Sequence, residues 1–182
     1  MSTSPTYDNS EFGRFEGILE TIWLNNGRDM KLKNDFAYFD PLDKKWFATA
    51  GSIVDGASIP KPFWSLIGGP FEGQYRNASV IHDVACVEMK EPWKNVHRMF
   101  YGACRCGGVG EIKAKIMYYA VFRFGPRWKP VYEERIEKGK KVTTQRFVRE
   151  IPVVSDQIRI TKAVNFIETN NPSLEEIENL DL

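Results

Sequence analysis

The stretch that decides the fold opens Val54-Asp55-Gly56-Ala57-Ser58-Ile59-Pro60 and reaches Ile81-His82-Asp83-Val84-Ala85-Cys86. It continues through Asn95-Val96-His97-Arg98-Met99-Phe100 and ends at Phe124-Gly125. Both histidines and all three cysteines of the chain lie inside it. Because these side chains carry much of the metal binding and acid–base catalysis in proteins, we expect any chemistry of this chain to lie here.

A long loop followed by three helices is predicted for this stretch. Pro60 and Pro62 restrict the residues before them to extended conformations, so residues 55–73 are predicted to form a loop, and long loops in compact domains are often functional. Apolar periodicity and the positions of proline and glycine place the helix boundaries. The predicted helices run from about Asn77 to Met89, from Pro92 to Gly107-Gly108, and from about Gly110 to Phe124.

The segments on either side of this stretch are predicted to form strands and a charged extension. Residues 15–54 carry β-forming runs separated by turn signals such as Asn25-Asn26-Gly27, which predicts a small antiparallel sheet of three or four strands. Residues 133–150 are charge-dense and suit a loop or hairpin, and residues 146–160 alternate as one or two strands. The capping-box pattern at 173–176 predicts a short acidic helix.

The predicted fold class is therefore α+β. A small N-terminal antiparallel sheet leads through a long loop into a three-helix block that carries His82-Asp83, followed by a C-terminal β-hairpin and a short helix. We expect a flexible N-terminus over residues 1–14, one α+β domain over 15–130, and a charged C-terminal extension over 131–182.

Composition excludes several classes of protein. The chain has 182 residues, 42% hydrophobic and 13% aromatic, which suits one packed domain. Its formal net charge of +1 argues against a dedicated nucleic-acid binder. No apolar run approaches a membrane span, and the first residues lack the pattern of a signal peptide. The odd number of cysteines, three, favours reduced thiols over a disulfide framework.

His82 and Asp83 form the centre of the candidate site, with His97 on the next helix. In one interpretation, all three bind a divalent transition metal such as zinc, and an open coordination position activates water. In the other, His82 is a general base that His97 orients, while Asp83 holds calcium together with loop carbonyls around Gly68-Gly69. Cys86 lies one turn after His82 and shares part of its helix face.

Other readings of these residues stay open. Asp55 and Ser58 are candidate substrate-binding residues of the loop, although Asp55-Gly56 is also an ordinary turn pair. Ser58 as a nucleophile lacks the Gly-x-Ser-x-Gly elbow. A zinc site built from the cysteines is disfavoured, because Cys104-Arg105-Cys106 has a single intervening residue, so buried thiols are expected. Both histidines also suit a purely structural role.

These motifs resemble a known family. The Asp-Gly-Ala-Ser-Ile-Pro run, Gly68-Gly69-Pro70, Ile81-His82-Asp83 and the Phe122–Gly125 end resemble DUF1353, a family of unknown function, over roughly residues 30–128. The resemblance implies a phage or prophage setting, a location in the host cytoplasm or the virion, and phage structural proteins or a host protein as partners. Where that family usually carries Ala-Asp, this chain has Val96-His97, an exchange that favours a transition metal over a carboxylate-oriented histidine.

A weaker similarity is to the phospholipases A2, which pair a glycine-rich calcium loop with a His-Asp helix. Here 66–70, His82-Asp83 and His97 take those places. Together the resemblances suggest a phage-linked, metal-dependent hydrolase, with zinc or calcium, that acts on a phospholipid ester or a cell-envelope bond. The alternative is a non-catalytic virion-assembly or host-interaction protein whose His-Asp cluster is structural.

Overall fold

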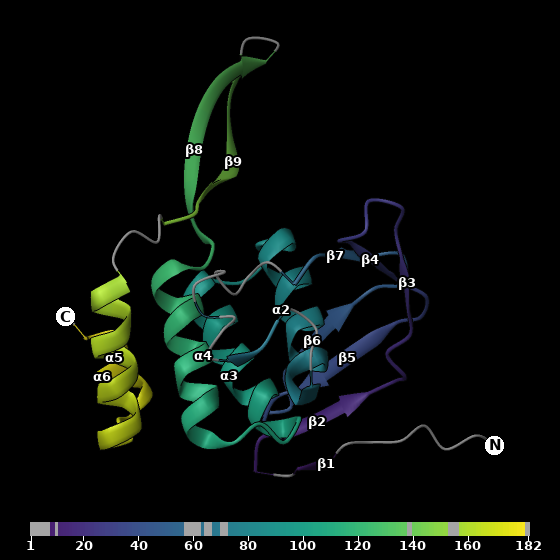
Figure 1. Ribbon diagram of the computed structural model, residues 1–182. Helices are drawn as coiled ribbons and strands as arrows, with labels where there is room; N and C mark the ends of the chain where they lie inside the picture. Colours follow the sequence, from purple (N-terminus) through teal and green to yellow (C-terminus); the bar gives the residue numbers. More distant parts are fainter. Residues whose placement is uncertain are drawn as a thin grey trace.

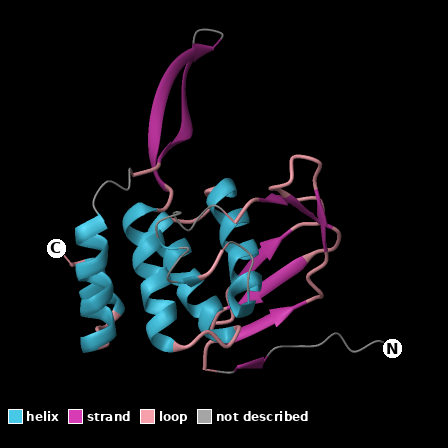
Figure 2. Cartoon of the chain, viewed as in Figure 1, coloured by secondary structure: helices cyan, strands magenta, loops and turns pink. Residues whose placement is uncertain are grey.

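A computed structural model shows the arrangement of the chain (Figure 1). The residues that it describes are 8–9, 11–56, 63, 67–69, 73–137, 140–152 and 157–180. The α+β class is confirmed: antiparallel strands precede a block of helices, and a hairpin and further helices follow (Figure 2). Among the helices of these segments, none has the length and apolar character needed to cross a membrane.

The N-terminal strands form two antiparallel sheets where a single sheet was predicted. The first has the order β1-β2-β5-β6 and comprises Asp8–Asn9, Gly13–Glu16, Phe36–Phe39 and Lys45–Ala48. The second has the order β3-β4-β7 and comprises Thr21–Trp23, Met30–Leu32 and Ile53–Val54. In the first sheet Phe15 lies opposite Tyr38 in register, and its ring stacks on Phe36 with centroids 5.6 Å apart.

The three central helices lie close to their predicted positions. They are α2 (Arg76–Glu88), preceded by the 3₁₀ turn η2 (Gly73–Tyr75), then α3 (Trp93–Cys106) and α4 (Glu111–Phe124). Pro92 is the residue before α3 and not its first helical residue. Helix α2 packs against α3 and against β5 and β6, so it joins the sheet to the helices (Figure 1).

The prediction of strands up to residue 160 is wrong over residues 157–160. The chain enters α5 (Gln157–Asn170) there, whose buried residues Ile160, Ala163, Val164 and Ile167 have the spacing of an amphipathic helix. Helices α5 and α6 (Leu174–Glu178) pack on α4. Helix α4 is therefore covered by α3 and also by α5 and α6. This explains why nine consecutive residues of α4, 114–122, are buried, although the sequence predicts a single apolar face.

The predicted hairpin and final capping box are both present. Strands β8 (Arg127–Glu137) and β9 (Lys140–Glu150) pair over their whole length and form a ribbon that extends away from the helices (Figure 1). At the base of this ribbon the indole of Trp128 is buried and donates a hydrogen bond to Glu91 O over 2.9 Å. At the start of α6, Ser173 and Glu176 form a reciprocal capping box.

Candidate functional site

The two histidines of the chain meet in the interior, between α2 and α3. His82 Nε2 and His97 Nδ1 lie 2.8 Å apart, and neither side chain is exposed to solvent. Phe100 packs 4.6 Å from the His82 ring, centroid to centroid, and Trp93 lies 5.5 Å from His97. The aromatic rings therefore enclose an imidazole pair that the sequence predicted to face each other.

The backbone carbonyl of Pro126 determines the tautomers of both rings. His97 Nε2 lies 3.0 Å from Pro126 O, and a carbonyl oxygen only accepts, so His97 Nε2 carries the proton. In a neutral ring Nδ1 is then an acceptor, and His82 Nε2–H donates to it. His82 Nδ1 consequently has a lone pair.

Cys86 completes a cluster with the two histidines. Its Sγ lies 3.9 Å from His82 Nδ1 and 3.7 Å from His82 Nε2, and the residue is 1% exposed. One ligand atom from each of His82, Cys86 and His97 lies within 4.8 Å of the others. The i, i+4 spacing on α2 brings the thiol beside His82, and Cys86 takes part in no disulfide.

Both imidazoles are held neutral. Burial lowers the pKa of His82 well below its ordinary value, and electrostatic interactions with His97 and with the cationic Arg149 lower it further. Burial lowers the pKa of His97 to about 3, against the hydrogen bond to Pro126, which raises it. A neutral imidazole is the form that binds a metal or accepts a proton, so both histidines are in their binding form at neutral pH.

The carboxylate of Asp83 points to the loop before α2. Its Oδ2 accepts a hydrogen bond from Gly56 N–H over 2.7 Å. Asp55 pairs with Arg28, whose Nη2 lies 3.0 Å from Asp55 Oδ2, and the Asp55 side chain is 40% exposed. Asp83 and His82 are adjacent in sequence, but the structure directs Asp83 to the loop and His82 to His97, because neighbouring positions on a helix face different directions.

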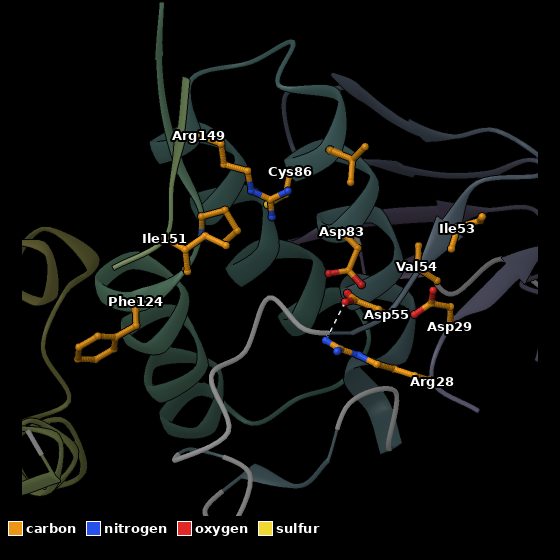
Figure 3. A pocket seen from close by; sticks show the side chains of 13 residues that line it. Arg28, Asp29, Ile53, Val54, Asp55, Asp83, Cys86, Phe124, Arg149 and Ile151 are labelled. Atoms are coloured by element: carbon orange, nitrogen blue, oxygen red, sulfur yellow. Dashed lines mark hydrogen bonds and ion pairs between the residues drawn. The ribbon is translucent and has the colours of Figure 1, made fainter. Parts of the chain in front are cut away.

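A pocket of about 400 Å³ adjoins the cluster. Asp83 and Cys86 line it from α2, Gly125 and Pro126 line it from the end of α4, and Arg28 and Asp55 line it from the strand region. Arg149 and Ile151 reach it from the end of the ribbon, so residues from the predicted C-terminal extension line the same pocket as the central domain. Figure 3 shows Arg28 and Arg149 entering from opposite sides, with the carboxylates of Asp55 and Asp83 between them.

The candidate residues thus divide into two groups. His82 and His97 meet in the buried cluster, whereas Asp55 and Asp83 line the pocket beside it. Ser58 lies outside the described residues. Gly69 is described, and its carbonyl accepts a hydrogen bond from the Tyr75 hydroxyl.

Three contributors were not among the predicted site residues. Cys86 was expected one turn after His82 on the same helix face, but it was interpreted as a buried thiol because the spacing of the cysteines disfavoured zinc. Neither the Pro126 carbonyl nor Arg149 carried any local signal, because each reaches the site through tertiary packing.

Comparisons with known proteins identify relatives over the central part of the chain. The family described as "Protein of unknown function (DUF1353)" matches residues 30–121. Two uncharacterized proteins of Sinorhizobium fredii are similar: y4jT is 51% identical over 98 residues, and y4iH is 42% identical over 97 residues. The alignments cover 54% and 53% of this chain but only 29% and 41% of those relatives. No solved structure matches.

Proposed function

This chain belongs to the DUF1353 family, and we propose that it is a metal-dependent hydrolase whose centre is the cluster of His82, Cys86 and His97. The observation that carries the proposal is the convergence of two neutral imidazoles and a thiol within 4.8 Å, beside a pocket of about 400 Å³. Three protein ligands leave a fourth position of a tetrahedral site open to water or substrate, which is the arrangement of catalytic zinc sites.

The donor set favours zinc over calcium. Imidazole nitrogen and thiolate sulfur are borderline or soft ligands that suit zinc, whereas calcium takes oxygen ligands. His97 donates its Nε2–H to Pro126 O, which leaves Nδ1 directed at the centre of the cluster. Metal-binding histidines commonly have such a hydrogen bond on the second nitrogen, because it fixes the ring and its tautomer. Zinc binding would displace the proton shared by the two rings and the thiol proton of Cys86.

The residues around the cluster have distinct roles in this proposal. A zinc ion held by His82, Cys86 and His97 would lower the pKa of bound water and polarise a substrate oxygen. Asp83 acts as the proton acceptor, because its carboxylate lines the pocket one helical turn from Cys86 and is held by Gly56 N–H. Asp55 binds substrate at the pocket rim and is itself held by Arg28.

The substrate class follows from the resemblances and from the pocket walls. We assign a phospholipid ester or a cell-envelope bond in a phage or prophage setting, with phage structural proteins or a host protein as partners. Apolar side chains beside the charged ones, Val87 and Ile151, suit a substrate that combines a polar ester with an aliphatic chain.

A second candidate function is supported by a specific observation. The hydrogen bonds from His82 to His97 and from His97 to Pro126 O link α2, α3 and the end of α4 without any metal. The cluster could therefore be a structural link in a virion-assembly or host-interaction protein, because buried polar groups that are fully hydrogen-bonded also specify a fold.

Zinc stoichiometry distinguishes the two functions. Purified chain is loaded with zinc, dialysed, and analysed by mass spectrometry beside Cys86→Ala, His97→Gln and the control Cys104→Ala, which removes another buried cysteine side chain that is not in a disulfide. We expect one zinc per chain in the wild type and in the control, and an affinity roughly 100-fold lower or worse in the other two variants. Equal zinc binding by Cys86→Ala and Cys104→Ala, in variants shown to be folded by circular dichroism, would refute the metal site and leave the structural role.

A further inference from the structure

Arg149 is held in a defined position at the base of the β8–β9 ribbon. It lies opposite Trp128 in the strand register, and Trp128 is only 6% exposed and hydrogen-bonded to Glu91 O. The ribbon is therefore anchored to the helices next to Arg149. In Figure 3 the Arg149 side chain extends from β9 into the pocket, toward Cys86.

The charge of Arg149 is not neutralised by a carboxylate of the described residues. On the opposite face of the ribbon, Arg146 pairs with Glu133 and Lys129 pairs with Glu150. Within the pocket, Arg28 pairs with Asp55. Arg149 has no ion pair with any residue in the described parts of the chain, so its guanidinium is the cation of this pocket that is available to a ligand.

The carboxylates of the pocket already have partners. Asp55 is held by Arg28, Asp83 accepts from Gly56 N–H, and Asp29 accepts from the Asn26 amide over 2.8 Å. Residues 28, 29 and 55 belong to the sheet side of the pocket, whereas Arg149 enters from the ribbon. The pocket is therefore electrostatically asymmetric, with an available positive group on the wall that also carries the apolar side chain of Ile151.

We propose that this pocket binds an amphipathic anion, an aliphatic chain with a compact oxyanion such as phosphate or carboxylate, and that Arg149 binds the oxyanion while Val87 and Ile151 contact the chain. The planar guanidinium forms paired hydrogen bonds with both kinds of oxyanion. The inference deepens the proposed hydrolase function and rests on it for the statement that the bound anion is the substrate. Binding itself needs no metal.

Titration calorimetry in the presence of a chelator tests the inference. Hexyl phosphate and hexanoate are the two oxyanion probes, and hexylammonium is the probe of opposite charge. The protein variants are wild type, Arg149→Gln and Arg146→Gln. The last is the matched control, because it removes the same charge from the same strand on the opposite face.

We expect the wild type and Arg146→Gln to bind at least one oxyanion probe with similar affinity, and Arg149→Gln to bind it roughly ten-fold more weakly or worse. A preference between hexyl phosphate and hexanoate then identifies the oxyanion. Equal affinities of Arg149→Gln and Arg146→Gln, hexylammonium binding as tightly as the anions, or no wild-type binding at millimolar probe would each overturn the inference. Since zinc is absent, such a failure is distinct from a failure of the metal site.

Discussion

His82 donates a hydrogen bond to His97 across the interface between α2 and α3, over 2.8 Å, in a region that excludes solvent from both rings. The pair links two helices that the chain connects by only a few residues. Because Pro126 O accepts the next hydrogen bond, the link extends to the segment after α4. The same bonds that orient the imidazoles for ligand binding therefore also join three parts of the fold.

The buried pair predicts a loss of stability in mild acid. Unfolded histidine has a pKa near 6.5, whereas His97 is lowered to about 3 and His82 is lowered too, so the unfolded chain binds more protons between these values. Stability should therefore be full above pH 6.5 and fall below it, by about 1.4 kcal/mol per pH unit for each histidine. Urea unfolding of the metal-free protein at pH 7, 6 and 5 measures this dependence.

His97→Gln is the informative variant for that measurement. It should be less stable at pH 7 but lose roughly half of the pH dependence between 6.5 and 5, where few carboxylates titrate. The chain has no histidines besides these two, so no other imidazole contributes. An unfolding free energy that is constant over this interval would contradict neutral burial of the pair.

Two variants of Asp83 distinguish a structural role of its carboxylate from a chemical one. Asp83→Ala removes the acceptor of Gly56 N–H and should cost about 2 kcal/mol of unfolding free energy, the typical value for a hydrogen bond to a charged group. Asp83→Asn retains an acceptor oxygen and should be nearly as stable as the wild type. If Asp83 is the proton acceptor, Asp83→Asn should nevertheless lose most hydrolytic activity in the zinc-loaded protein. A fully active Asp83→Asn variant would exclude that role.

Glu178 should anchor the C-terminal helix to the core. It accepts hydrogen bonds from Arg98 over 2.7 Å and from the Tyr118 hydroxyl over 2.5 Å, and its side chain is 15% exposed. Glu178→Gln should cost about 1–3 kcal/mol. Glu175 also pairs with Arg98 but is 66% exposed, so Glu175→Gln should cost at most about 0.5 kcal/mol. Chemical unfolding of both variants compares them directly, and equal effects would contradict the anchor.

Gly125 ends α4 beside the pocket, where there is no space for a side chain. A Cβ there would lie 2.3 Å from Val121 O. Its backbone conformation suits any residue, so the constraint is steric. Gly125→Ala should therefore cost about 1–3 kcal/mol. Gly110 starts the same helix with no atom near its Cβ position, and Gly110→Ala should change stability by less than about 1 kcal/mol. Thermal unfolding measures the stability of both variants, and a larger loss in Gly110→Ala than in Gly125→Ala would contradict the prediction.

Local patterns were sufficient to predict much of the fold. The turn signals between β-forming runs, Pro92 before α3, Gly125 after α4 and the capping box at Ser173 each act on neighbouring residues, so their effects are readable from a short stretch. The division of the strands into two sheets could not be predicted from local patterns, because strand pairing joins residues that are distant in sequence, such as Lys31 and Ile53. The apolar residues of α5, from Ile160 to Ile167, have a helical spacing in the sequence. The strand-like alternation of the residues before them led to the prediction of a strand instead.

The sequence by itself determined that His82, Cys86 and His97 lie on two neighbouring helices, because helical periodicity and a short connection require it. Only the tertiary structure decided which side chains meet. It directed His82 to His97 and to the Pro126 carbonyl, sent Asp83 to Gly56, and brought Arg149 to the pocket from a strand more than fifty residues away in sequence. The physical reason is that these contacts depend on the packing of whole elements, which no local pattern encodes.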